Sequence, residues 1–254
     1  MPEKKPLSTL GTALVTGGAQ RIGAEVCRTL HKAGMNLIIH YGRSAFEANA
    51  VADALNKERA NSAILLQADL RDHTELQALA ERACILADDL SLLVNNASAF
   101  DSRTLADTDQ QHWQQMHSIN TEAPYFLSQA LAEQLRKNAG SIVNIVDIHA
   151  RHPLKNYSAY CASKAGLLGV TRSLALELAP FVRVNAVSPG AILWPDGNEG
   201  EFSEQKKQVI LEKVPLRDLG RPRDIANAVS FLALQAPYIT GEVINVDGGR
   251  SISV

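Results

Sequence analysis

The sequence predicts an α/β fold, in which helices cover both faces of a doubly wound parallel sheet. Two observations lead to this prediction. Short apolar runs rich in β-branched residues alternate with longer segments of helical periodicity. The short runs are nearly continuous in apolar character, which is typical of parallel strands buried on both faces. Because no repeat or interdomain linker interrupts the alternation, we expect a single domain over residues 1–254.

The elements follow one another in a regular order. Strands are expected at residues 12–16, 36–40, 63–67, 92–95, 141–146, 182–187 and 242–246. Helices are expected at residues 24–33, 46–59, 74–87 and 157–179. In the first helix Val26, Leu30 and Ala33 lie on one side, which gives it an apolar face that can pack on the sheet.

Composition and charge exclude several classes of protein. The chain is 46% hydrophobic, and its 25 Lys and Arg stand against 27 Asp and Glu, so a basic surface for nucleic acid is not expected. Cys27, Cys84 and Cys161 form no CxxC pair, which indicates reduced thiols rather than a disulfide framework or a metal site. No apolar run approaches the roughly 20 residues of a membrane span, and the N-terminus lacks the apolar core of a signal peptide. We therefore expect a cytoplasmic protein with no membrane or nucleic-acid partner and no metal.

A glycine-rich turn follows the first strand. It reads Thr16-Gly17-Gly18-Ala19-Gln20-Arg21-Ile22-Gly23 and leads into a helix. Glycines at such a turn let the backbone approach a diphosphate, and the helix N-terminus supplies N–H donors and the positive end of its dipole. Ordinary tight turns also use glycine, but the place of this one predicts a dinucleotide site.

The end of the second strand selects the nucleotide. The stretch His40-Tyr41-Gly42-Arg43-Ser44 carries no acidic residue for the ribose hydroxyls of NAD. Arg43 can clamp a 2′-phosphate with its planar fork, and Ser44 can add a hydroxyl, so NADP(H) is favoured. The plainer alternative is that Arg43 is solvated and Ser44 only caps the next helix.

A long segment without periodicity follows the sixth strand. Residues 190–204 are rich in glycine and proline and would lie at the carboxyl edge of the sheet, where ligands bind in open α/β folds. We interpret this segment as a substrate lid.

The order of the motifs resembles that of the short-chain dehydrogenase/reductase family over essentially the whole chain. Besides the glycine turn, the shared motifs are Asn95-Asn96-Ala97, Asn120, Tyr160-Cys161-Ala162-Ser163-Lys164, Pro189-Gly190 and Asp247-Gly248-Gly249. The resemblance implies a Rossmann-type sheet and an NADP(H)-dependent oxidoreductase. It also implies a homotetramer, to which the 157–179 helix would contribute a face.

Three departures from the commonest family pattern resemble its pteridine reductase branch. Arg21 replaces the middle glycine of the turn, Asp147 replaces the serine that precedes Tyr160, and Ser98-Ala99-Phe100 replaces the usual glycine after Ala97. The stretch from His40 to Ser44 and Tyr157 also fit that branch. The implied substrate is a dihydropterin, a dihydrofolate or an oxidised pterin. Some members of the branch end with an Arg that enters the neighbouring subunit's site, whereas this chain ends Ser251-Ile252-Ser253-Val254.

The resemblance implies roles for the matching positions. Cofactor binding is implied for Gly17, Arg21, Ile22, Gly23, His40, Tyr41, Arg43, Ser44, Asp69, Leu70, Asn96, Ala97, Ser98, Tyr160, Lys164, Pro189 and Gly190. Substrate binding is implied for Arg21, Ser98, Phe100, Asp147, Tyr157 and Tyr160, with Phe100 stacking on the pterin. Asp147, Tyr160, Lys164 and Asn120 are the implied catalytic residues, Asn120 as the helix-kinking residue that anchors a water behind the lysine. Arg21, His40, Arg43 and Lys164 would then form a local cationic site.

The chemistry of hydride transfer explains the catalytic assignments. Tyr160 can supply the proton, and Lys164, four residues on, lies on the same helical face, where its ammonium would lower the pKa of the phenol. An ionised Asp147 can only accept hydrogen bonds, which suits the N–H groups of a pterin and not a ketone oxygen. A protonated Asp147 would instead relay a proton through Tyr160.

Each substrate-site assignment has a plainer alternative. Asp147 could cap a loop, Arg21 could be an exposed arginine at a helix start, and Phe100 could be a core residue. His149 and His152 are expected to be solvated, and Cys161 is expected to serve packing.

Two other functions stay open at this point. The protein could be a carbonyl or 3-oxoacyl reductase of the same family, in which Asp147 is an unusual substitution. It could also be a catalytically silent NADP-binding sensor, although the paired Tyr160 and Lys164 argue against that.

Overall fold

Seven parallel strands form one sheet in the computed structural model, which describes residues 10–192 and 204–253. The strands are β1 (Thr12–Val15), β2 (Asn36–Tyr41), β3 (Ala63–Gln67), β4 (Leu90–Asn95), β5 (Ser141–Ile145), β6 (Arg183–Pro189) and β7 (Val243–Val246). Their order in the sheet is β3-β2-β1-β4-β5-β6-β7, and every pairing is parallel. This is the Rossmann-type, doubly wound arrangement that the sequence predicts.

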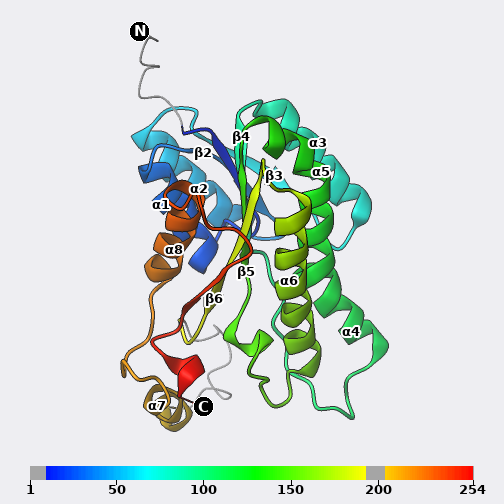
Figure 1. Cartoon of the computed structure of the whole chain (residues 1–254), viewed down its shortest axis with the longest axis vertical. Coiled ribbons are helices and arrows are strands. Elements are labelled where there is room, and N and C mark those ends of the chain that lie inside the picture. The colour runs from blue at the N-terminus through cyan, green and yellow to red at the C-terminus, as the bar shows by residue number, and fades with distance from the viewer. Residues whose placement is uncertain (1–9, 193–203, 254) are drawn as a thin grey trace.

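Helices cover both faces of the sheet (Figure 1). One layer contains α1 (Arg21–Lys32), α2 (Ala45–Glu58) and α8 (Pro222–Leu234). The other contains α3 (His73–Leu86), α5 (Ala123–Lys137) and α6 (Ser158–Glu177). The remaining segments are α4 (Gln110–His117), the π-helical turn η1 (Ser118–Glu122), the 3-10 turns η2 (Ile148–Ala150) and η3 (Arg250–Ile252), and α7 (Glu204–Glu212).

Each layer of helices buries an apolar core against the sheet. Successive side chains of a strand point to opposite faces, so Val15 joins the core under α1 and α8, whereas Leu14 joins the core under α3 and α5. Strands buried on both faces explain the nearly continuous apolar runs of the sequence.

The predicted elements exist, but pairing with neighbouring strands sets their ends. β4 begins at Leu90, two residues earlier than expected, because that residue pairs with Thr12. β6 runs on to Pro189, which pairs with Val246. The structure also adds α4, α5, α7 and α8, which we did not assign from the sequence.

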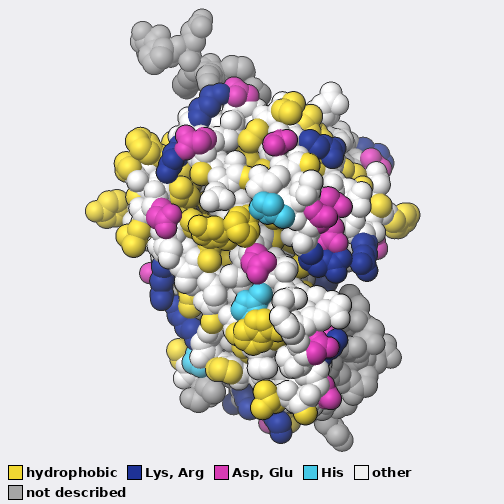
Figure 2. All heavy atoms as spheres, turned by 90° about the vertical axis from the view of Figure 1, so that its right-hand side faces the viewer, with side chains coloured by type: hydrophobic (Ala, Val, Ile, Leu, Met, Phe, Trp, Pro, Cys, Tyr) yellow, Lys and Arg dark blue, Asp and Glu magenta, His cyan; other side chains and the backbone are white. Residues whose placement is uncertain are grey.

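The outer side of the α3, α5 and α6 layer carries both signs of charge. Figure 2 shows Lys, Arg, Asp and Glu side chains scattered over this face, with hydrophobic side chains gathered near its middle. No helix among the described residues is long and apolar enough to cross a membrane.

Candidate active site

The predicted site residues gather at the carboxyl edge of the sheet, toward the lower end of Figure 1. The glycine turn follows β1, Asp147 follows β5, and Pro189 ends β6. The strand order reverses between β1 and β4, and open α/β sheets bind ligands at such a switch point.

The glycine turn leaves no room for side chains at two positions. A Cβ on Gly23 would lie 2.1 Å from the carbonyl oxygen of Gly17, and a Cβ on Gly17, whose φ is +61°, would lie 3.0 Å from the Cα of Ala97. The Asn96 amide donates to the carbonyl oxygens of Thr16 (2.9 Å) and Gly17 (3.0 Å). The backbone N–H of Ala97 donates to Thr16 Oγ1 at 3.0 Å. Asn96 and Ala97 therefore hold the shape of the turn, and their direct contact with a cofactor stays a prediction.

Arg21 begins α1 in a strained conformation. Its φ is +50°, in the left-handed region, which costs a residue with a side chain roughly 1–2 kcal/mol. This explains why glycine is the usual residue there. Its exposure agrees with the plainer alternative, but backbone strain is typical of functional positions and favours a role in the site. The next residue, Ile22, packs against the core.

His40 does not belong to a cationic site, and that prediction is wrong. The side chain is 2% exposed, and its Nδ1 accepts the Gly17 N–H at 3.2 Å while Nε2 lies 3.0 Å from the Ala68 carbonyl oxygen. An accepting Nδ1 requires a neutral ring, and burial lowers the pKa of the imidazole. His40 therefore ties the glycine turn to the strand beside it.

A hollow of about 390 Å³ opens beyond the ends of β2 and β3. Arg43, Asp69 and Arg71 contribute charged walls, and Met116 and Ile119 contribute apolar ones. Its size and mixed lining fit the adenosine half of a dinucleotide. Leu70, beside Asp69 in the chain, is buried.

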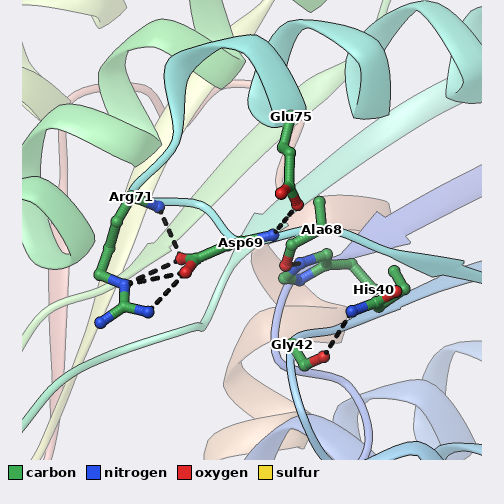
Figure 3. A network of polar contacts seen from close by, with 7 residues as sticks. His40, Gly42, Ala68, Asp69, Arg71 and Glu75 are labelled. Atoms are coloured by element: carbon green, nitrogen blue, oxygen red, sulfur yellow. Dashed lines mark hydrogen bonds and ion pairs between the residues drawn. The ribbon is translucent and has the colours of Figure 1, made fainter.

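Asp69 is held from two sides at the rim of this hollow, as Figure 3 shows. Arg71 Nε donates to Asp69 Oδ1 at 2.9 Å and its Nη2 donates to Oδ2 at 2.5 Å. The Asp69 N–H donates to Glu75 Oε2 at 2.6 Å. The Arg71 hydrogen bond is the largest cause that lowers the pKa of Asp69 to about 2. Arg71 was not predicted as a site residue from the sequence. Its position two residues after Asp69, at the end of a strand, could have indicated that the two side chains form an ion pair.

The residues predicted to select the nucleotide lie at the end of β2 and beside the hollow. Tyr41 ends β2, and Arg43 is exposed at the hollow. Ser44 is the N-cap residue of α2, where its carbonyl oxygen accepts the Ala48 N–H at 3.0 Å and its side chain makes no capping hydrogen bond.

Tyr160, Asp147 and Lys164 meet below β5. The Tyr160 hydroxyl donates to Asp147 Oδ2 at 2.6 Å, while Asp147 Oδ1 accepts the His149 N–H at 2.8 Å. Asp147 thus both caps η2 and bonds Tyr160. Lys164 is 2% exposed; its Nζ donates to the Ile145 carbonyl oxygen at 2.9 Å and lies 5.9 Å from the centre of the Tyr160 ring.

The pKa of Tyr160 moves in the direction opposite to the prediction. Burial is the main cause that raises it, and the charge and hydrogen bond of Asp147 raise it further. The Lys164 ammonium points to Ile145, and burial lowers its own pKa to about 8. Burial of the Tyr160 ring and the Asp147 carboxylate therefore decide the pKa of this phenol.

Asn120 joins the two halves of the site. It lies within η1, the π-helical turn that separates α4 from α5, so the predicted helix irregularity is present. Its Oδ1 accepts from the N–H of Ala99 and from Ser98 Oγ, both at 2.9 Å. Its Nδ2 donates to the Ala99 carbonyl oxygen at 2.9 Å and to Ser163 Oγ at 3.0 Å. The side chain links the loop after β4 to the helix that carries Tyr160 and Lys164.

Phe100 forms an aromatic wall rather than part of the core. It is 43% exposed, which rules out the core alternative. Its ring stacks on that of Tyr157, with 4.5 Å between centroids, and meets the Tyr160 ring edge-on at 4.8 Å. Three predicted substrate residues therefore form one aromatic cluster, in which Phe100 is exposed and the two tyrosines are buried.

The end of β6 lies close to the C-terminal strand. The Gly190 N–H donates to the Val246 carbonyl oxygen at 3.0 Å, and a Cβ on Gly190 would lie 2.6 Å from Asp247 Cβ. Most of the predicted lid, residues 193–203, lies outside the described residues.

His149, His152 and Cys161 lie near the site, but the sequence predicts no catalytic role for them. His149 and His152 are both half-buried, and the His149 Nδ1 lies 2.7 Å from the His152 carbonyl oxygen, so the His149 ring is less solvated than predicted. Cys161 is buried, and its Sγ accepts the Leu154 N–H at 3.4 Å, which confirms a packing role. Among the described residues, no group of three His, Cys, Asp or Glu is placed to hold a metal.

Comparisons with known proteins agree with this geometry. A family model described as enoyl-(acyl carrier protein) reductase matches residues 17–251. Pteridine reductase 1 of Leishmania tarentolae is 36% identical, across 96% of this chain and 98% of its own length. A 3-oxoacyl-[acyl-carrier-protein] reductase of Staphylococcus aureus is 33% identical, across 94% of this chain and 97% of its own length. The chain therefore belongs to the short-chain dehydrogenase/reductase family of oxidoreductases.

Proposed function

We propose that the protein is an NADPH-dependent pteridine reductase. The observation that carries this proposal is the Asp147 carboxylate, which lies 2.6 Å from the Tyr160 hydroxyl. An ionised carboxylate beside a ketone oxygen is repulsive, whereas beside the ring N–H or amino group of a pterin it is complementary. The similarity to a pteridine reductase across nearly the whole chain supports the same substrate class.

NADP(H) is the cofactor that the residues fit. The turn around Gly17 and Gly23 has no room for a Cβ, and a turn without side chains at a helix N-terminus lets a diphosphate approach the backbone N–H groups. Arg43 at the hollow and the hydroxyl of Ser44, which makes no capping hydrogen bond, suit a 2′-phosphate. When bound, the nicotinamide supplies the hydride to a ring carbon of the pterin.

The chain's own residues supply the rest of the chemistry. Tyr160 gives a proton to the ring nitrogen next to the reduced carbon, and its hydroxyl is then reprotonated by way of Asp147 or water. Lys164 offers an ammonium beside the phenol to offset the negative charge that this transfer leaves. Phe100, stacked on Tyr157, presents a flat surface for the pterin ring.

A 3-oxoacyl or carbonyl reductase is the second candidate. The similarity to a 3-oxoacyl-[acyl-carrier-protein] reductase at 33% identity favours it. Asp147 speaks against it, because its carboxylate would face the carbonyl oxygen of the substrate. A silent NADP-binding sensor is the third candidate, and any turnover with a pterin would exclude it.

The test is an NADPH oxidation screen with biopterin, dihydrobiopterin, dihydromonapterin, dihydrofolate and an acetoacetyl thioester. We expect turnover with at least one pterin, inhibited by methotrexate, and little with the thioester. Asp147→Ser should lower kcat/KM for the pterin roughly 10–100-fold, since a hydrogen bond to a charged group is worth about 1.5–3 kcal/mol. The thermal midpoint of the variant should stay close to that of the wild type. Full pterin activity in Asp147→Ser, or a preference for the thioester, would contradict the proposal.

A homotetramer in the cytoplasm completes the proposal. The hydrophobic side chains near the middle of the face in Figure 2, and Leu176 of α6, which is 83% exposed, suit a subunit contact. The three free cysteines suit a reducing compartment. Light scattering coupled to size-exclusion chromatography tests the assembly, and a monomeric mass would refute it.

A further inference from the structure

The hollow beyond the ends of β2 and β3 has two basic and two acidic side chains in its described lining. They are Arg43, Asp69, Arg71 and Glu75, so their formal charges cancel. A phosphate monoester carries about −1.5 to −2 charges at pH 7. Whether a 2′-phosphate is attracted to this hollow therefore depends on how the four charges are paired.

The Arg71 guanidinium is engaged by Asp69, as Figure 3 shows. Its Nε donates to Asp69 Oδ1 at 2.9 Å and to Oδ2 at 3.2 Å, and its Nη2 donates to Oδ2 at 2.5 Å. The backbone N–H of Arg71 also donates to Oδ1, at 3.0 Å. The adjacent carboxylate of Asp72 is engaged elsewhere, because it accepts the N–H groups of Thr74 and Glu75 at the start of α3. Arg71 and Asp69 therefore act as one neutral unit.

Arg43 lies at the same hollow with its side chain exposed. Within residues 10–192 and 204–253, no hydrogen bond or ion pair engages its guanidinium. The Arg71 hydrogen bond is the largest cause that lowers the pKa of Asp69, and the charge of Arg43 lowers it as well. Glu75 is held by the Asp69 N–H, at 2.6 Å from its Oε2. Asp69 is thus the carboxylate that would attract Arg43 if Arg71 were absent.

We propose that Arg71 is a specificity-determining residue for the cofactor, which acts by neutralising Asp69. With Arg71 in place, the Arg43 guanidinium stays available to a 2′-phosphate. Without it, Asp69 and Glu75 would leave the hollow with a net negative charge that repels this phosphate. A dinucleotide with a plain 2′-hydroxyl carries no such charge and would be affected much less. The inference rests on the proposed function for NADP(H) as the cofactor, and not for the substrate.

The test compares the Kd values of NADPH and NADH in fluorescence titrations without any pterin. The two dinucleotides differ only in the 2′-phosphate, so the ratio of their Kd values isolates that group. At low ionic strength we expect Arg71→Ala to lower the preference for NADPH roughly 3–10-fold, with the Kd of NADH changed less than about twofold. Arg71→Lys should keep most of the preference, because its ammonium also neutralises Asp69. The loss in Arg71→Ala should shrink at about 0.5 M salt, where the Debye length is only about 4 Å.

A double variant separates an action through Asp69 from a direct contact with the phosphate. Arg71→Ala combined with Asp69→Asn removes both charges of the pair and leaves the net charge of the hollow as it is in the wild type. The double variant should therefore regain the wild-type preference for NADPH to within about twofold. If Arg71 contacted the phosphate itself, the double variant would stay well below the wild type.

Arg136→Ala is the matched control. Arg136 also pairs with a carboxylate, that of Glu133, and its side chain is 38% exposed, against 42% for Arg71. It lies in the last turn of α5, where Lys137 pairs with Asp88 just before β4 begins, at the sheet edge opposite the hollow. The ratio of Kd values should be the same in Arg136→Ala as in the wild type.

The outcomes separate the inference from the proposed function. An unchanged ratio in Arg71→Ala, or a double variant that does not regain the preference, would overturn the role of Arg71. A wild type that binds NADH as tightly as NADPH would refute the choice of cofactor and the inference together. A wild type that turns over no pterin would refute the proposed reaction, while the titrations would still decide the role of Arg71.

Discussion

Replacing Asn120 by Ala tests how the two halves of the site are joined. The substitution removes one side chain that makes four hydrogen bonds inside the protein. Asn120 is 0% exposed, so no bulk water replaces it. The N–H and carbonyl of Ala99 and the hydroxyl of Ser163 would lose a partner, whereas the exposed Ser98 hydroxyl can turn to solvent.

The three hydrogen bonds to Ala99 and Ser163 therefore contribute to the expected loss of stability. At a net value of about 1 kcal/mol each, Asn120→Ala should lower the free energy of unfolding by about 3 kcal/mol. For a chain of this size that corresponds to a fall in Tm of about 6–12 °C. Since globular proteins are stable by about 5–15 kcal/mol, the variant should still fold and can be assayed.

Urea unfolding followed by circular dichroism, without ligands, measures this loss. Ser98→Ala is the control, because it removes only the solvent-accessible bond and should cost less than about 1 kcal/mol. Release of Ala99 should also loosen Phe100, which raises KM for the pterin more than KM for NADPH. A loss in Asn120→Ala no larger than in Ser98→Ala would refute the reasoning.

Two further predictions concern the lysine and the cofactor cradle. Burial lowers the pKa of Lys164 to about 8, so activity should fall as pH rises through that value, and Lys164→Arg, which stays charged, should lose this decline. Between about pH 8 and 10.5 only the unfolded chain holds the lysine proton, so the free energy of unfolding should rise with pH in that window, and not in Lys164→Met. If the activity of Lys164→Arg also falls at this pH, the decline belongs to the titration of another group. Gly23→Ala should abolish NADPH binding in a fluorescence titration, because its Cβ would meet the Gly17 carbonyl oxygen at 2.1 Å. Gly169→Ala, where a Cβ meets nothing within 4 Å, is the control, and equal binding by both variants would contradict the argument.

The local motifs of the site could be predicted from the sequence. Tyr160 and Lys164 lie one helical turn apart, so a helix was enough to place them on one face. The glycine turn at the start of α1 was readable in the same way, because its geometry depends on consecutive residues. Asp147 was found through its spacing from Tyr160, and the structure adds the hydrogen bond between them.

Protonation states could not be predicted in this way. His40 is neutral because Gly17 and Ala68 take both ring nitrogens, and these residues lie 23 and 28 positions away in the chain. Tyr160 is harder to ionise than the adjacent lysine suggested, because burial and Asp147 raise its pKa.

The sequence by itself determined the alternation of strands and helices, the glycine turn and the chemical types of the site residues. These depend on local periodicity, on backbone conformations that only glycine adopts easily and on functional groups that each residue carries wherever it lies. The tertiary structure alone decided which charges are buried and which groups face one another. The physical reason is that desolvation and Coulomb interactions depend on distances in space, and a parallel sheet makes neighbours of residues that are far apart in the chain.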